Sequence, residues 1–141
     1  MIHYLSEEQV VSLHAKIVRA KGGTRGIRDK SALAAAVARP YATFDGEDLY
    51  PTLAEKASAL MHSLAMNHPF LDGNKRIAVA SAEFFIEING CSLTATDHEF
   101  EDLTMALASS KLDKDQLAVW FKQRIVRRED DPGNYVDIEE W

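Results

Sequence analysis

The signature stretch of this chain is His68-Pro69-Phe70-Leu71-Asp72-Gly73-Asn74-Lys75-Arg76, and the predicted fold and function both depend on it. Within nine residues it holds a histidine, a carboxylate, a glycine, an amide and two cations. Apolar residues at helical spacing precede it over 53–66 and follow it over 77–88. We therefore predict a polar loop that connects two helices and ends at the N-terminus of the second helix.

This position favours the binding of an anion. The first N–H groups of a helix have no partner within the helix and the dipole there is positive, so phosphate binds readily. Gly73 lets the backbone approach a ligand closely, while Lys75 and Arg76 add positive charge. Asp72 would repel a phosphate unless a cation lay between them, which implies Mg²⁺ held together with phosphate oxygens. With the imidazole of His68 suited to proton transfer near neutral pH, the residues indicate a Mg²⁺–nucleotide site with a histidine base.

The signature stretch resembles that of the Fic/Doc (Fido) family, His-Pro-Phe-x-(Asp/Glu)-Gly-Asn-(Gly/Lys)-Arg, at nearly every position. Two further runs, 22–26 and 46–53, resemble the death-on-curing (Doc) branch of that family. The resemblance covers about residues 1–126. It implies a Fic/Doc (Fido) domain over this range.

The resemblance also implies a chemistry. Family members transfer part of a nucleotide triphosphate to a protein hydroxyl. Most Fic-type members move AMP and carry Gly-Asn-Gly-Arg, whereas Doc-type members carry a lysine in place of the second glycine. The Doc branch resembles kinases that place the γ-phosphate of ATP on elongation factor Tu and stop translation. Here Gly73 matches the Fic pattern and Lys75 matches the Doc pattern.

The lysine is the reason to favour a kinase. Where glycine leaves room for the α-phosphate against the helix end, the side chain of Lys75 fills space and brings charge, so it could turn the nucleotide around and present the γ-phosphate. The resemblance thus implies a Doc-like toxin that phosphorylates a protein hydroxyl on an elongation factor Tu-like target. Two alternatives remain open: a Fic-type protein adenylyltransferase, and a catalytically idle binding protein that uses the same groove.

Roles follow from the resemblance for six residues. His68 corresponds to the base that accepts the proton of the target hydroxyl, and Asp72 corresponds to the Mg²⁺ ligand. Nucleotide and phosphate binding is assigned to Gly73, Asn74, Lys75 and Arg76, with Arg76 on a terminal phosphate. The competing interpretation is an ordinary helix-linking loop with surface cations, but six typed positions at fixed spacing rarely coincide.

A hairpin is predicted over residues 41–51. The runs 41–44 and 49–50 are strand-like, and Asp45-Gly46 between them is a turn signal. The resemblance implies that this hairpin is the flap that lies over the active site and positions the target by strand addition; the alternative is a surface hairpin without a function. The predicted flap residues are Thr43, Phe44, Asp45, Gly46, Glu47 and Asp48.

Capping signals place most of the helices. A residue that caps a helix start is followed three positions later by Glu or Gln at Ser6/Gln9, Thr52/Glu55, Thr96/Glu99 and Asp113/Gln116. A short alanine-rich helix is expected over 31–38, and a largely apolar central helix over 74–89. The predicted fold is therefore an all-α, compact bundle of about six helices with a small β-hairpin flap. His14 lies beside the buried face of the first helix and is expected to be a packed histidine.

Composition excludes several classes of protein. A chain of 141 residues with 46% hydrophobic and 27% charged residues is typical of one globular domain with its own core. No apolar run is long enough to span a bilayer, and the N-terminus has no signal-peptide pattern. Cys91, the single cysteine, fits a reducing cytoplasm, and the net charge of −6 argues against a nucleic-acid partner. A cytoplasmic protein without a membrane partner is expected.

The C-terminal residues of the sequence differ from the rest in composition. Residues 127–141 hold six acids and two arginines, which predicts an acidic and flexible C-terminal tail. Its apolar side chains leave open that it docks on the body or on a partner; they are Tyr135, Val136, Ile138 and Trp141.

An antitoxin is the other expected partner besides the protein substrate. Many Fic-type proteins carry an inhibitory helix with the pattern (Ser/Thr)-x-x-x-Glu-(Gly/Asn). In this chain Thr43 and Glu47 have that spacing, but Asp48 follows where Gly or Asn is required. The resemblance to toxin–antitoxin modules therefore implies that a separate antitoxin holds the enzyme in check.

Overall fold

The structure, a computed structural model, describes residues 1–128. Within this range it is a bundle of six α-helices, which confirms the predicted all-α fold. The helices are α1 (Glu7–Lys21), α2 (Lys30–Ala38), α3 (Leu53–Asn67), α4 (Asn74–Ile88), α5 (Asp97–Ala108) and α6 (Lys114–Arg124). A 3₁₀ turn, η1 (Arg39–Tyr41), follows α2 directly. None of the described helices is both long and apolar enough to cross a membrane.

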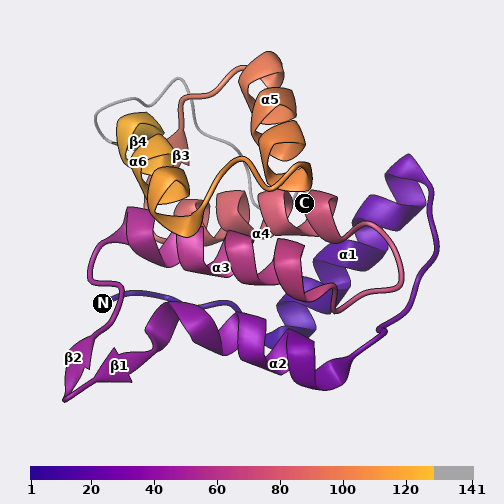
Figure 1. The fold of residues 1–141 in the computed structure, drawn as a ribbon, viewed down its shortest axis with the longest axis horizontal. Coiled ribbons are helices and arrows are strands. Elements are labelled where there is room, and N and C mark those ends of the chain that lie inside the picture. Colours follow the sequence, from indigo (N-terminus) through magenta and orange to yellow (C-terminus); the bar gives the residue numbers. More distant parts are fainter. Residues whose placement is uncertain (129–141) are drawn as a thin grey trace.

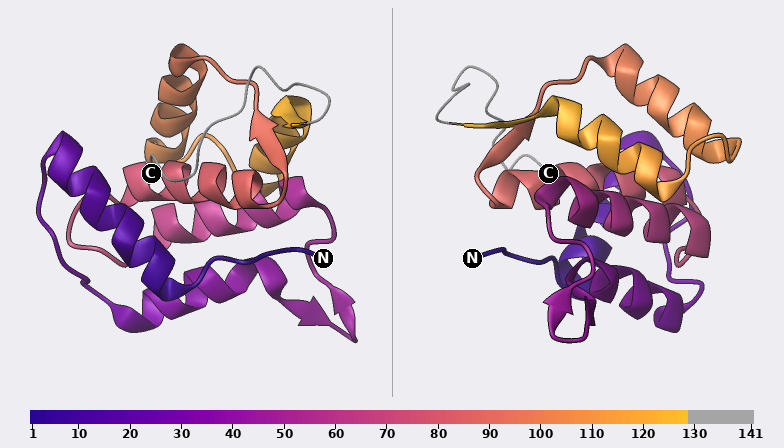
Figure 2. Two further views of the ribbon diagram at one scale, coloured as in Figure 1. Left: turned by 180° about the vertical axis from the view of Figure 1, so that it is seen from behind. Right: turned by 60° about the vertical axis from the view of Figure 1, so that its left-hand side comes forward.

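The helices α3 and α4 form the middle of the molecule. They pack against each other, with α1 and α2 on one side and α5 and α6 on the other (Figures 1 and 2). The loop that joins α3 to α4 contains most of the signature stretch. The two central helices therefore fix the position of that loop.

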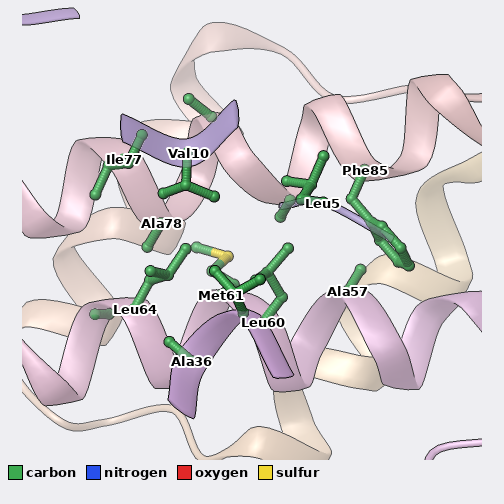
Figure 3. Close-up of a cluster of buried hydrophobic side chains, with 14 of the residues drawn as sticks. Leu5, Val10, Ala36, Ala57, Leu60, Met61, Leu64, Ile77, Ala78 and Phe85 are labelled. Atoms are coloured by element: carbon green, nitrogen blue, oxygen red, sulfur yellow. The ribbon is translucent and has the colours of Figure 1, made fainter. Parts of the chain in front are cut away.

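The core lies between α3, α4 and the first two helices. Leu60 and Met61 of α3 pack with Ile77 and Phe85 of α4, and Val10 of α1 closes the cluster (Figure 3). All five side chains are at most 1% exposed. Burial of one such side chain stabilises a fold by about 1.5–3 kcal/mol, so the helices flanking the loop are held rigidly.

The predicted helix starts are confirmed. Capping boxes are formed by Ser6 with Gln9, Thr96 with Glu99 and Asp113 with Gln116, and the Thr52 side chain accepts from the backbone N–H of Glu55. The short helix begins at Lys30 and is capped by Asp29, which accepts from Ala32 N.

A hairpin forms between β1 (Thr43–Phe44) and β2 (Glu47–Asp48), which are antiparallel. The hairpin was predicted to lie over the signature stretch, but the structure places it elsewhere. The hairpin leads into the N-terminal end of α3, whereas His68 follows the C-terminal end (Figure 1). A helix of 15 residues rises by about 22 Å, and this length separates the two segments.

A second antiparallel pair was not predicted. It joins β3 (Cys91–Leu93) to β4 (Ile125–Arg127), and Arg128 N donates to Gly90 O at 3.2 Å. Ile125 follows α6 directly and is the first residue of β4. The domain boundary predicted after residue 126 thus falls inside β4, and the remaining tail residues, 129–141, lie outside the described part of the chain.

Candidate active site

The α3–α4 loop begins with a left-handed residue and ends with another. His68 follows α3 with φ 48° and ψ 57°, and Gly73 precedes α4 with φ 75°. Gly73 accepts the first helical hydrogen bond from Ile77 N at 2.9 Å. The N–H groups of residues 74–76 come before that bond, so they belong to the unpaired donors of a helix start.

The structure brings the six candidate residues of the signature stretch together. They line one small cavity of about 280 Å³, which also has Leu71 in its wall. The full lining is His68, Leu71, Asp72, Gly73, Asn74, Lys75 and Arg76. The hairpin residues Thr43 to Asp48 are not part of it.

Asp72 is held as a carboxylate. Its Oδ2 accepts from Thr24 N at 3.1 Å and its Oδ1 accepts from Gly73 N at 2.8 Å. These two backbone donors, with Arg76 and His14 as weaker causes, lower the pKa of Asp72 below its ordinary value. Among the described residues no group of three or more His, Cys, Asp or Glu side chains could hold a metal. Asp72 offers a metal one carboxylate, and Mg²⁺ is usually held by one or two carboxylates together with waters and phosphate oxygens.

The side chain of Asn74 is used within the loop. Its Oδ1 accepts from Phe70 N and its Nδ2 donates to Phe70 O, both at 3.0 Å. This pair of bonds closes the turn 70–74. A ligand can meet Asn74 at its backbone N–H, while the amide keeps the loop in shape.

Phe70 and His14 support the loop from beneath. Phe70 is 1% exposed, and its ring stacks on the His14 ring with centroids 3.9 Å apart. His14 Nε2 lies 2.8 Å from Asp72 O, and because a carbonyl only accepts, Nε2 carries the proton. His14 is thus buried, as predicted, but its partners are 56 and 58 residues away, which local sequence spacing does not reveal.

Two residues of the α1–α2 loop, residues 22–29, lie against the site: Gly23 and Thr24 both approach Asp72. A Cβ on Gly23 would lie 2.7 Å from Asp72 Oδ2 and 3.2 Å from Arg76 Nη2, and its φ is 119°. Only glycine suits this close approach. In the sequence, the run 22–26 resembles the Doc branch, but no local spacing reveals that Gly23 contacts the site.

A groove continues from the site along α4. It consists of two cavities, of about 290 and 700 Å³, that share Lys21, Arg76, Val79, Glu83 and Thr104. We call it the α4 groove; it lies between α1, α4 and α5. Since Arg76 lines both the groove and the small cavity, a molecule in the groove would reach the small cavity at the start of α4.

Glu83 gives the groove a group that titrates near neutral pH. Burial raises the pKa of Glu83 to about 7, and Glu87 and Asp97 add repulsion. The native state therefore binds more protons than the unfolded state between pH 4.5 and about 7, and stability falls as the pH rises through this range.

Replacing Glu83 with glutamine is expected to remove this pH dependence. The variant should be more stable than the parent above pH 7 by about 1–3 kcal/mol and similar to it below pH 4.5. Urea unfolding at several pH values measures the difference. Glu101→Gln, an exposed change in the same groove, serves as the control. Parallel pH profiles for the parent and Glu83→Gln would contradict the assignment.

The helical fold and the signature stretch in the α3–α4 loop together point to one class of protein. Residues 4–86 match the model of the Fic/DOC family, and the chain belongs to that family. It is 46% identical to "Toxin Doc" of Mycolicibacterium smegmatis over 121 residues, which cover 84% of this chain and 90% of the relative. It is 28% identical to "Protein kinase doc" of Escherichia phage P1 over 117 residues, which cover 83% of this chain and 91% of that relative.

Proposed function

We propose that this protein is a Doc-type toxin that transfers the γ-phosphate of ATP to a protein hydroxyl and thereby arrests translation. The observation that carries this proposal is the position of Lys75 in the first turn of α4, in the same small cavity as His68 and Arg76. The names of the two relatives, a toxin and a protein kinase, support it. An elongation factor Tu-like protein is the proposed target, so the proposed reaction takes place in the cytoplasm.

His68 is the proposed general base. Its side chain is exposed and lines the cavity. It accepts the proton of the target hydroxyl while the hydroxyl oxygen forms a bond to the γ-phosphorus. The bond between the γ-phosphorus and the β–γ bridging oxygen breaks, and ADP leaves with that electron pair.

The start of α4 is the proposed phosphate site. The N–H groups of its first turn, the positive end of the helix dipole and the Arg76 guanidinium all favour the negative charge of the phosphates. Mg²⁺ held by Asp72 would neutralise part of the nucleotide charge. The rigid core beneath α4 keeps these donors in place during the reaction.

The alternative is transfer of AMP. Gly73, which is the N-cap of α4 with φ 75°, matches the first glycine of the adenylyltransferase pattern. In our proposal Lys75 decides between γ-phosphate transfer and AMP transfer, because it stands where the adenylyltransferase pattern has its second glycine.

Intact-mass analysis of candidate target proteins tests the function. Each target, elongation factor Tu first, is incubated with the protein, ATP and Mg²⁺. A gain of one phosphate is the expected result, and a gain of AMP would establish the adenylyltransferase instead. No change across a broad set of targets would favour the idle binding protein. Incubation without Mg²⁺ should abolish the gain if Asp72 holds the metal.

The hairpin is proposed as a second contact for the target, remote from the reacting hydroxyl. Phe44 at its tip is 77% exposed, and the residues of both strands are exposed. Lys56, buried in α3, forms an ion pair with Asp48 at 3.0 Å and ties the hairpin to the body. Phe44→Ala should raise the KM for the protein target and leave the KM for ATP unchanged. An unchanged KM for the target would remove the hairpin from the binding surface.

A separate antitoxin segment is the proposed occupant of the α4 groove. The part of the groove of about 290 Å³ is lined by the apolar Val79 and Ala80, by the cations Lys16, Lys21 and Arg76, and by Glu83 as its one acid. The acids Asp97 and Glu101 line the other part. These features fit an amphipathic helix with acidic residues that folds on binding. Such a helix would cover Arg76 and block the phosphate site.

The chain's own tail is the competitor for that role. Expression of residues 1–128 and of the full chain, each without a partner, separates the two cases. We expect both forms to arrest growth. A harmless full chain with a toxic 1–128 form would mean that the tail is the inhibitor, and the proposal of a separate antitoxin would fail.

A further inference from the structure

We propose that Arg28 is a positioning residue that holds His68 in the conformation needed for proton transfer. This inference rests on the proposed function, in which His68 is the base. Arg28 lies in the α1–α2 loop, 40 residues before His68, and no feature of the signature stretch points to it.

Arg28 binds three consecutive carbonyl groups that end α3 and begin the following loop. The Arg28 guanidinium donates from Nη2 to Asn67 O at 2.9 Å and from Nε to His68 O at 2.6 Å. The backbone N–H of Arg28 donates to Pro69 O at 2.7 Å. Its side chain and main chain therefore fix the backbone before, at and after His68.

His68 needs such support. A left-handed conformation costs a residue with a side chain roughly 1–2 kcal/mol, and it persists only where the surroundings impose it. The last carbonyls of a helix are also unpaired and carry partial negative charge, which a guanidinium satisfies with charge-assisted bonds. Arg28 restrains the backbone of His68, the proposed base, and also pairs these carbonyl groups.

The main chain around Arg28 strengthens this arrangement. Leu71 N donates to Gly26 O at 3.0 Å, and Asp29 N shares Pro69 O at 3.1 Å. Ile27 and Phe70 form an isolated antiparallel bridge between the two loops. The backbone of the α1–α2 loop is thus fixed against the α3–α4 loop, so the Cα from which the Arg28 side chain extends has a defined position.

The phosphate ligands lie on the other part of the loop. The proposed metal contact at Asp72 and the proposed phosphate contacts at residues 73–76 follow His68 in the loop, whereas Arg28 binds the carbonyls of residues 67–69. Loss of the guanidinium should therefore disturb the base without disturbing the nucleotide. This separation distinguishes a positioning role from a general loss of structure.

The test compares Arg28→Met with the parent in the full chain. We expect kcat to fall on the order of ten- to a hundredfold, as for a misplaced catalytic group, with the KM for ATP and the affinity for ADP unchanged. Arg28→Lys should recover only part of kcat, because an ammonium cannot make the two-bond fork. Arg25→Met, at an exposed cation of the same loop, is the matched control and should keep the parental kcat.

A second measurement does not need activity. The ring and backbone NMR signals of His68 in Arg28→Met should show averaging between conformations, while those of the parent and of Arg25→Met show one. A parental kcat in Arg28→Met, equal losses in both variants, or a rise in the KM for ATP would overturn the inference. If the parent itself modifies no target, the proposed function fails, and the NMR comparison still decides whether Arg28 holds His68.

Discussion

Replacing His68 with alanine is expected to abolish transfer and growth arrest while the protein remains folded. The imidazole is exposed and lies outside the buried core, so its loss removes the proposed base without opening a cavity. A positioned base contributes about 10²–10⁴-fold, so a loss of at least a hundredfold in kcat is expected. Transfer of label from γ-labelled ATP and thermal unfolding measure the two properties.

A second variant separates the loss of the imidazole from any change in the backbone conformation of residue 68. Asparagine tolerates the left-handed conformation of residue 68 better than most residues, but it cannot act as the base. His68→Asn should therefore lose as much activity as His68→Ala. His98→Ala, at an exposed histidine of α5, should remain fully active. A His68 variant with full toxicity would refute the proposed role.

Replacing Lys75 with glycine should change the transferred group. The variant recreates the Gly-Asn-Gly-Arg pattern at the start of α4, so γ-phosphate transfer should fall at least tenfold on the scale of a lost electrostatic contact. AMP transfer would be seen as incorporation from α-labelled ATP. The α- and γ-labelled nucleotides, used in parallel, distinguish the two reactions.

Lys75→Ala controls for the helix itself. Glycine in a helix costs about 1 kcal/mol relative to alanine, so only the glycine variant loosens the first turn of α4. If the alanine variant also loses γ-phosphate transfer, the lysine side chain is responsible. Unchanged γ-phosphate transfer in Lys75→Gly would mean that Lys75 does not orient the nucleotide.

Local patterns predicted what lies close together in the sequence. The caps at Ser6, Thr96 and Asp113 and the loop between the two central helices all depend on residues within a few positions of one another. The same is true of the cavity at the start of α4. Such features follow from helix periodicity and from the chemistry of a helix start.

Features that need distant partners were missed or misplaced. Arg28 and Gly23 reach the site only because the α1–α2 loop packs on the α3–α4 loop, and no spacing rule reports that contact. The pairing of β3 with β4 joins residues 91 and 127, so the short strands had no local signal. The hairpin was recognised, but its position depends on the 15-residue length of α3, which moves it away from His68.

The late position of β4 in the chain has a consequence during synthesis. Cys91 and its strand leave the ribosome long before Ile125–Arg127, so β3 waits for its partner until the described part of the chain is almost complete. A nascent chain that already contains the whole signature stretch thus lacks the strand that ties the end of α6 to the end of α4. We expect the β3–β4 pair to form only after residues 125–127 have left the ribosome, later than the helices that flank the signature stretch.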